Sequence, residues 1–208
     1  NVENLFPPDG ENVDLKNSEF RNWDRYKYGL KIRKLGHVFR FMKEDFGQLP
    51  SVIGLAEIGD RSVLEDLVNQ NSQLHHYEII HQQSNDSRGL SVALLFDKEK
   101  YTLVHFDSLR FNINENLRFE TRDILHAEFL FQGKKLHVFV CHLPSKREKD
   151  SKKAQRNYIL EQLNKTICDL LKKQEPIILM GDFNENPDSA ELQQLLIDND
   201  GNTRLSNA

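Results

Sequence analysis

Apolar runs with the character of β-strands alternate along this chain with segments of helical periodicity, and three of the runs end directly in a polar residue. Glu57 follows the run VIGLA, His142 follows LHVFVC, and Asp182 follows PIILMG. Sheet folds place their ligand sites at the carboxyl ends of strands. The chain is therefore expected to form an α/β domain with its functional site where these strands end.

The same patterns give the expected elements along the chain. Helical spacing of apolar residues predicts helices over residues 28–46, 63–68, 152–173 and 191–197. Strands are expected over residues 52–56, 77–81, 90–96, 102–106, 123–131, 135–143 and 176–180. Residues 7–24 and the Asn-rich stretch 112–120 are expected to be loops. Since no linker or repeat interrupts the pattern, residues 1–208 are interpreted as a single domain.

Composition excludes several classes of protein. Lys and Arg number 28 against 32 Asp and Glu, a net charge of −4, which argues against coating nucleic acid by bulk charge but allows a nuclease with a local basic patch. No apolar run approaches the roughly 18 residues of a membrane-spanning helix. The two cysteines, Cys141 and Cys168, form neither a zinc motif nor a disulfide framework and are expected to be buried thiols.

The polar residues at the strand ends have the chemistry of a phosphate-handling metal site. The carboxylates of Glu57 and Asp182 suit a hard divalent cation, and the His142 imidazole and the amides of Asn184 and Asn1 suit phosphate oxygens. Taken singly, each has a plainer explanation. Glu57 could cap a helix, His142 could be an ordinary strand-end histidine, and the Asp-Phe-Asn stretch could be a turn. Together, the independent strand ends favour a site.

Several motifs, taken together, resemble the endonuclease/exonuclease/phosphatase superfamily of DNase I-like proteins, in particular its bacterial members. In chain order they are NVENLF, GLAEI, SRGLSVALLF, TRDIL, VCHLPSK and LMGDFNENP. The resemblance covers essentially the whole chain. It implies a four-layer α-β-β-α sandwich, in which two mixed β-sheets pack face to face between outer helices. It also implies a phosphodiesterase that depends on a divalent metal, Mg²⁺ or Mn²⁺.

The resemblance assigns roles near the front and middle of the chain. Glu57 matches the metal-binding glutamate of the family. Asn1 matches its first-strand asparagine, which helps to hold the metal site and the phosphate. His142 matches a histidine that hydrogen-bonds a phosphate oxygen, and Arg122 lies where nuclease members carry an arginine that reaches a phosphate. Such donors stabilise the charge that develops on phosphoryl oxygens.

The resemblance also implies that the GDFN motif positions the attacking water, which is the nucleophile of the reaction. Asp182 and Asn184 match the pair that orients the attacking water and contacts the phosphoryl group, so Asp182 would position or help activate that water. With Asn1 and His142, these residues form the expected catalytic set.

A basic stretch follows His142 and is either a solvated helix start or a lip that holds a polyanionic substrate. Its members are Lys146, Arg147, Lys149, Lys152, Lys153 and Arg156. Lys146 is the candidate phosphate contact in this stretch. Arg88, beside Gly89, is another, although a plain turn explains that pair equally well. Trp23, Tyr26 and Tyr28 are expected to pack inside the fold.

Two features depart from the family pattern. The family's final Asp-His pair, whose histidine acts as the general base, has no counterpart before Ala208, and the strand expected before Asn1 is absent. The domain is therefore expected to be incomplete at both ends, with C-terminal strands missing. Ser91 stands where related sequences often carry an acid, and it cannot form an ion pair with His142. Asp86 and Asp123 are the candidates to replace that acid.

Three functions remain open at this point. The leading hypothesis is a monomeric Mg²⁺- or Mn²⁺-dependent phosphodiesterase that acts on DNA or RNA. The second keeps the chemistry but changes the substrate, as in a phosphoinositide phosphatase or a sphingomyelinase-like phosphoesterase. The third is a catalytically degenerate binding module of the same fold. The sequence leaves the compartment open between cytoplasmic and exported.

Overall fold

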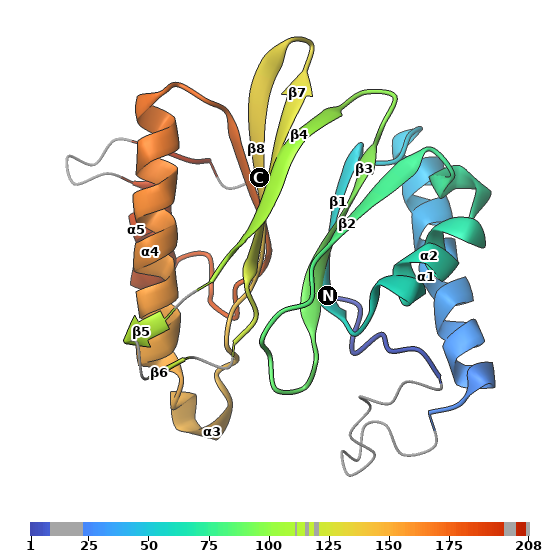
Figure 1. Cartoon of the computed structure of the whole chain (residues 1–208), viewed down its shortest axis with the longest axis horizontal. Coiled ribbons are helices and arrows are strands. Elements are labelled where there is room, and N and C mark those ends of the chain that lie inside the picture. The colour runs from blue at the N-terminus through green and yellow to red at the C-terminus, as the bar shows by residue number, and fades with distance from the viewer. Residues whose placement is uncertain (9–22, 111, 115–116, 119–120, 198–202, 207–208) are drawn as a thin grey trace.

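The structure is a computed structural model that describes residues 1–8, 23–110, 112–114, 117–118, 121–197 and 203–206. Two β-sheets lie face to face in the middle of the molecule, and helices cover the outer side of each (Figure 1). These four layers confirm the sandwich that the resemblance implied. Within the described residues, no helix is long and apolar enough to cross a bilayer.

The two sheets differ in size and in strand direction. The smaller sheet is antiparallel, with β1 (Val52–Ile58), β3 (Ser91–Asp97) and β2 (Tyr77–His81) in that order across it. The larger, mixed sheet runs in the order β4 (Thr102–Leu109), β7 (Ile124–Phe131), β8 (Lys134–His142) and β9 (Ile177–Asp182). β9 is parallel to β8, and the other neighbours are antiparallel. The opening segment adds a parallel bridge between Leu5 and Ile58.

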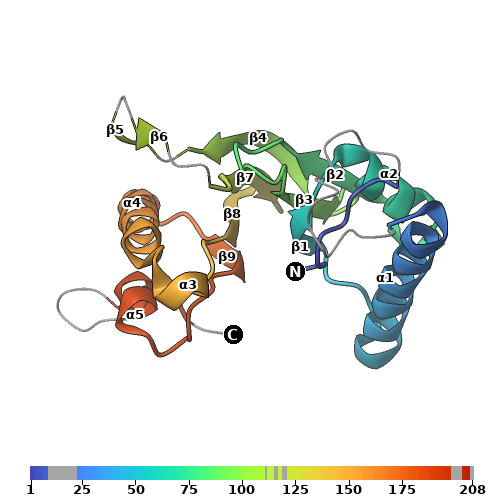
Figure 2. The same ribbon diagram turned by 90° about the horizontal axis from the view of Figure 1, so that it is seen from below.

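Different helices cover the two sheets. The smaller sheet carries α1 (Arg25–Phe46) and α2 (Arg61–Asn69), and the larger sheet carries α4 (Lys153–Lys172) and α5 (Ala190–Leu196) (Figure 2). Short elements complete the fold: η2 (Ser72–Leu74), β5 (Asn112–Asn114), β6 (Leu117–Arg118) and α3 (Arg147–Asp150). Asp24 caps α1 by accepting a hydrogen bond from the backbone N–H of Lys27, and Gly47 ends it in the left-handed conformation.

Each interface between layers holds its own buried apolar cluster, because successive strand residues point to opposite faces. On β3, Leu95 packs toward α1 and α2, whereas Leu94 packs between the sheets. On β8, Val138 packs between the sheets, whereas Phe139 packs toward α4 and α5. Each such side chain contributes roughly 1.5–3 kcal/mol by leaving water. The double-sided burial fixes the register of the strands that carry the site.

Most sequence-predicted elements are present, and the predicted hairpin is formed by β7 and β8. Residues 112–120 were expected to be a loop, but 112–114 pair with 117–118 as a small ladder, because backbone pairing outweighs the low strand preference of asparagine. The packing prediction for Tyr26 was wrong. Tyr26 lies two residues from the buried Tyr28 and so points to the outer side of α1. Cys141 is buried as expected, and Cys168 is half-buried. Most of the predicted 7–24 loop lies outside the described residues.

Candidate active site

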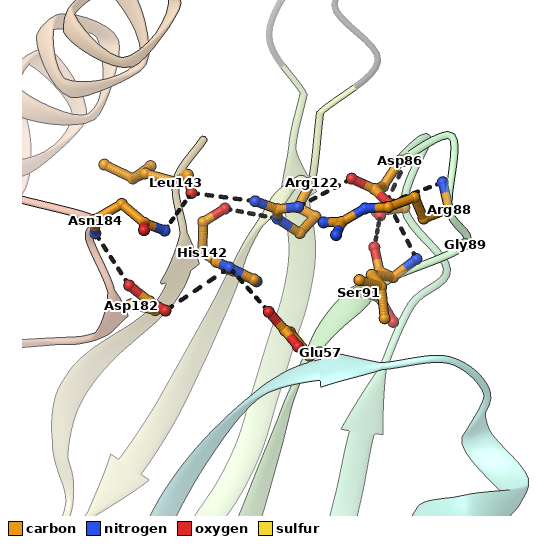
Figure 3. Close-up of polar contacts among 12 residues, drawn as sticks. Glu57, Asp86, Arg88, Gly89, Ser91, Arg122, His142, Leu143, Asp182 and Asn184 are labelled. Atoms are coloured by element: carbon orange, nitrogen blue, oxygen red, sulfur yellow. Dashed lines mark hydrogen bonds and ion pairs between the residues drawn. The ribbon is translucent and has the colours of Figure 1, made fainter. Parts of the chain in front are cut away.

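Polar side chains from both sheets meet where β1, β8 and β9 end (Figure 3). The parallel register of β8 and β9 pairs His142 with Asp182, so these two residues leave the larger sheet side by side. Glu57 approaches them from β1 of the smaller sheet. Asn1 reaches the same place from the opening segment, which runs along the end of β1 and bridges to it at Ile58. The structure thus brings together residues that the sequence placed at separate strand ends.

A bulge in β1 aims Glu57 into the site. Ala56 and Ile58 pair with successive residues of β3, which leaves Glu57 unpaired between them. Its φ of 69° lies in the left-handed region, which costs a residue with a Cβ about 1–2 kcal/mol. Bulges of this kind commonly redirect a side chain next to an active site. The strain indicates that the direction of the Glu57 carboxylate has a function.

The Asn1 side chain bridges the two carboxylates of the site. Its Nδ2 donates to Glu57 Oε1 at 3.1 Å and to Asp182 Oδ2 at 3.0 Å, while its Oδ1 accepts from the backbone N–H of Glu3 at 2.8 Å. The backbone N–H of Asn4 donates to the other Glu57 oxygen at 2.8 Å. In this arrangement the amide nitrogen faces the carboxylates. Asn1 therefore orients the acidic groups, and a metal-ligand role for its oxygen would require the amide to turn.

Asp182 is held in its ionised form. Burial favours the protonated acid, but hydrogen bonds from the Asn1 amide and from the backbone N–H of Asn184 outweigh it and keep the pKa of Asp182 below its usual value. Asn184 also donates from Nδ2 to the Leu143 carbonyl at 2.9 Å, which joins the segments that follow β8 and β9. Asp182 is consequently a carboxylate at neutral pH, with one oxygen directed at Asn1.

Gly181 allows β9 to deliver Asp182 to this position. Its φ is 135°, and a Cβ there would overlap the backbone carbonyl oxygen of Cys141 on β8. The glycine that precedes Asp182 in the GDFN motif is therefore needed for close approach of the two strands.

His142 is buried and faces both carboxylates (Figure 3). Its Nε2 lies 3.7 Å from Glu57 Oε1 and 3.8 Å from Asp182 Oδ2, which is longer than a hydrogen bond. Burial and the nearby positive charge of Arg122 lower the pKa of His142 to about 4, against the opposing effect of the two carboxylates. His142 is therefore a neutral imidazole at pH 7, and its Nε2 remains available to a substrate.

No acid orients His142 within the described part of the chain, where its buried Nδ1 has no hydrogen-bond partner. Ser91 instead donates to the Ile58 carbonyl at 2.8 Å and lies 2.6 Å from His81 Nε2. The expectation that Asp86 or Asp123 replaces the missing acid was wrong. Both carboxylates are engaged by arginines, Asp86 by Arg122 and Arg88 and Asp123 by Arg110.

Arg122 lies behind His142 with its guanidinium bonded to the protein. Nε donates to the His142 carbonyl at 3.0 Å, Nη2 donates to the Leu143 carbonyl at 3.1 Å, and Nη1 donates to Asp86 Oδ2 at 3.1 Å. Both members of the Arg122–Asp86 ion pair are buried. In this geometry Arg122 braces the end of β8, and the expected phosphate contact would require it to leave these partners.

The two other candidate phosphate contacts remain partly exposed. Arg88 lies 3.6 Å from Asp86. Its positive charge is also close enough to His142 to help lower the pKa of that histidine. Lys146 lies 2.7 Å from a carboxylate oxygen of Glu185 and, with Asp182 and Asn184, lines a cavity of about 910 Å³. Both cations lie beside the site, as the sequence suggested.

Arg156 was counted with the exposed basic stretch, but the structure buries it completely. Nε donates to Glu185 Oε1 at 2.8 Å, Nη1 to the Pro144 carbonyl at 3.2 Å, and Nη2 to Asp150 Oδ2 at 3.0 Å. Pro144 and Glu185 follow the strand ends that carry His142 and Asp182, so one side chain of α4 holds both loops. The sequence did hold a signal for the burial of Arg156, because it lies four residues before Leu160 and so on the apolar face of the helix.

The Endonuclease/Exonuclease/phosphatase family matches residues 1–207. The chain belongs to this family. Hydrolytic phosphoesterases are members of this family. No curated protein sequence matches the chain significantly.

Solved structures of other family members share the fold at low sequence identity. The human nocturnin catalytic domain with bound sulfate is 15% identical, with a TM-score of 0.60, over 78% of this chain and 60% of that chain. TDP2 from D. rerio in complex with a single-strand DNA product is 18% identical, with a TM-score of 0.53, over 92% and 62%. A mannosyl-6-phosphatase from Bacteroides thetaiotaomicron is 15% identical, with a TM-score of 0.62, over 93% and 67%. The chain thus spans about three fifths of the length of the first of these structures.

The acidic groups of this family member suit a hard divalent cation. The carboxylates of Glu57 and Asp182 face the same space and are separated by the Asn1 amide. Carboxylate oxygens are the ligands that Mg²⁺ and Mn²⁺ prefer. Among the residues that the structure describes, no cluster of three or more His, Cys, Asp or Glu could enclose a metal ion. Mg²⁺ commonly binds through one or two carboxylates and keeps several waters, so two acids and open space fit it.

Proposed function

We propose that this protein is a divalent-metal-dependent phosphodiesterase that cleaves phosphodiester bonds in nucleic acid. The observation that carries the proposal is the convergence of Glu57, Asp182 and the neutral His142 from two different sheets. One carboxylate for a cation, a second ionised carboxylate for the attacking water and a neutral hydrogen-bond donor match what phosphodiester hydrolysis requires as charge builds on the phosphoryl oxygens.

Glu57 would hold Mg²⁺ or Mn²⁺, with Asn1 and the backbone N–H of Asn4 fixing its carboxylate. The bound ion supplies Lewis-acid stabilisation of a phosphoryl oxygen. Asp182 is ionised and orients the attacking water, from which it can accept a proton.

The remaining donors act on the phosphoryl group. His142 donates from Nε2, which is free of hydrogen bonds to its acidic neighbours. Asn184 has a second N–H on Nδ2 besides the one directed at Leu143. Arg122 acts indirectly, because its bonds to the carbonyls of His142 and Leu143 keep the imidazole in place.

Nucleic acid is the favoured substrate because Arg88 and Lys146 place exposed cations on either side of the site. The likeness to D. rerio TDP2, whose structure holds a single-strand DNA product, supports the same choice. Phosphomonoester hydrolysis is the second candidate, and the likeness to a mannosyl-6-phosphatase favours it.

A substrate panel tests the proposal. Purified protein is assayed with Mg²⁺, Mn²⁺ or EDTA on single-stranded DNA, RNA, a generic phosphodiester, a sugar phosphate, an inositol polyphosphate and sphingomyelin. We expect metal-dependent cleavage of nucleic acid, its loss in Asp182→Asn, and its retention in the control Asp188→Asn, which changes an exposed acid six residues later. Preference for a phosphomonoester or a lipid would move the assignment to the other substrate classes. Absence of hydrolysis with either metal would refute an enzymatic function.

A further inference from the structure

The outer side of α1 carries an unusual combination of exposed apolar side chains and positive charge. Tyr26 is 73% exposed, Val38 50% and Phe41 53%. Phe46 is also exposed, but it ends the helix in line with the buried Tyr28 and does not belong to this outer side. The helix lies at the rim of the molecule, on the side of the smaller sheet away from the larger one (Figure 2). Three large apolar groups on the outer side of one helix differ from the singly scattered apolar residues that are normal on the surface of a folded protein.

The same helix is strongly basic in an otherwise acidic chain. It holds seven Lys and Arg residues against Glu44 and Asp45, a net charge of +5, whereas the whole chain carries −4. Lys31 turns inward to the backbone oxygen of Glu3, but Arg33 and Lys34 are exposed. The positive charge is therefore concentrated on the outer layer of the smaller-sheet half.

The charged and apolar groups occupy the same arc of the helix. At about 100° per residue, Tyr26, Arg33, Lys34, Val38 and Phe41 fall within roughly 140° of one another. The buried residues Tyr28, Ile32 and Phe39 lie on the opposite side of the helix. α1 therefore has two apolar faces. The inner face packs in the core, and the outer face combines apolar side chains with basic ones.

The helix α4 shows that such a face is not a general property of the outer layers. Its exposed charges are paired: Glu161 with Lys165 at 3.0 Å and Asp169 with Lys172 at 2.9 Å within the helix, and Lys153 with Glu191 of α5 at 2.9 Å. No large apolar residue of α4 is among the exposed ones in the described chain. The outer face of α4, with paired charges and without large exposed apolar residues, is typical of a helix that contacts only water. The outer face of α1 is not typical of such a helix.

We propose that the outer face of α1 docks on the surface of an anionic phospholipid bilayer. Arg33 and Lys34 would meet the headgroup phosphates, while Val38 and Phe41 enter the boundary between headgroups and acyl chains, as in interfacial helices. Contact with a second copy through this face is opposed by the +5 charge on each helix. Nucleic acid would use the cations but would leave Val38 without a suitable contact. The proposal is independent of the phosphodiesterase assignment.

Vesicle sedimentation with the full chain tests the docking surface. Vesicles of phosphatidylcholine alone are compared with vesicles that also contain phosphatidylserine, at low and high salt. We expect binding only to the anionic vesicles, weakened by salt. The double variant Arg33→Gln with Lys34→Gln should weaken it roughly 10–30-fold. Val38→Gln with Phe41→Gln should weaken binding at both salt concentrations, since apolar burial is not screened.

Matched variants on other elements serve as controls. Lys165→Gln with Lys172→Gln removes as much charge from α4, and Val104→Gln with Phe106→Gln removes exposed apolar groups from β4. Both should bind vesicles like the wild type. Equal binding to neutral and anionic vesicles, or equal losses in the controls, would overturn the proposal. The proposal would also be overturned if the wild type bound a single-stranded oligonucleotide but not vesicles, and if only the Arg33 and Lys34 double variant lost binding to the oligonucleotide.

Discussion

The two halves of the sandwich contribute to the site in different ways. The smaller-sheet half supplies Glu57 through a strained bulge, and its carboxylate is held by Asn1 and the Asn4 backbone. The larger-sheet half supplies His142 and Asp182 from regular parallel strands. On the proposed function, this difference is a division of labour: the smaller-sheet half would hold the cation through Glu57, and the larger-sheet half would hold the phosphoryl group and the water.

Two buried arginines support only the larger-sheet side of the site. Arg156 ties the loops after β8 and β9 to α4, and Arg122 binds the carbonyls at the end of β8. Arg122 also pairs with Asp86, from the loop that connects β2 and β3 of the other half. The segments that carry His142 and Asp182 are thus braced by buried arginines, whereas the carboxylate of Glu57 is positioned by the bulge in β1 and by hydrogen bonds from the opening segment.

The largest effect is expected from the smaller-sheet half. Glu57→Gln removes the charge that would hold the cation and should lower the hydrolysis rate at least about 10³-fold, at any Mn²⁺ concentration tested. Rates across a Mn²⁺ titration measure this. The matched control Glu65→Gln changes an exposed acid on α2 and should retain full activity. Recovery of the Glu57→Gln rate at high Mn²⁺ would show that Glu57 is dispensable for the chemistry.

The support of the larger-sheet half is tested by Arg156→Met. This change removes the buried guanidinium that joins Glu185 to Asp150 and leaves Glu185 with its ion pair to Lys146, so it should cost about 3 kcal/mol in the free energy of unfolding. Denaturant titration in EDTA measures the cost, with Lys165→Met as a control that removes an exposed partner and should change stability by less than about 0.5 kcal/mol. Similar losses in both variants would contradict a bracing role for Arg156.

The phosphoryl side of the comparison is tested by His142→Ala. Loss of one fixed donor should lower kcat by about 10²–10³-fold, with a smaller change in KM. Steady-state kinetics measure the split, and His105→Ala, an exposed residue of β4, is the control. A raised KM at unchanged kcat would assign His142 to substrate binding instead.

The smallest effect concerns the outer helices. Asp24→Ala removes the side-chain cap of α1 and should cost about 1 kcal/mol in the free energy of unfolding. The N-cap residue of α4, Lys152, makes no side-chain capping hydrogen bond, so Lys152→Ala should be nearly neutral. Equal losses of unfolding free energy in the two variants would show that helix capping does not distinguish the smaller-sheet half from the larger-sheet half.

The sequence predicted the strand ends that carry Glu57, His142 and Asp182, because apolar alternation and the residues that terminate it are local signals. The four-layer arrangement came from the ordered motifs of the family. The left-handed backbone of Glu57 was not predictable in this way, because it depends on how β1 pairs with β3.

The two buried arginines show the same limit. Arg156 belongs to a basic stretch by composition, and although its spacing from Leu160 indicates the buried face of α4, only the structure reveals that it binds two distant loops. Arg122 was expected to reach substrate, but its three protein partners come from β8, the residue after it, and the loop at Asp86. Such roles arise from long-range contacts, which local periodicity does not encode.

The most direct test of the division of labour is Mn²⁺ binding to EDTA-stripped protein, followed by electron paramagnetic resonance. Wild type and His142→Ala should bind Mn²⁺ with similar affinity, whereas Glu57→Gln should show no measurable binding. Wild-type affinity in Glu57→Gln, together with loss of binding in His142→Ala, would contradict the assignment of the cation to the smaller-sheet half.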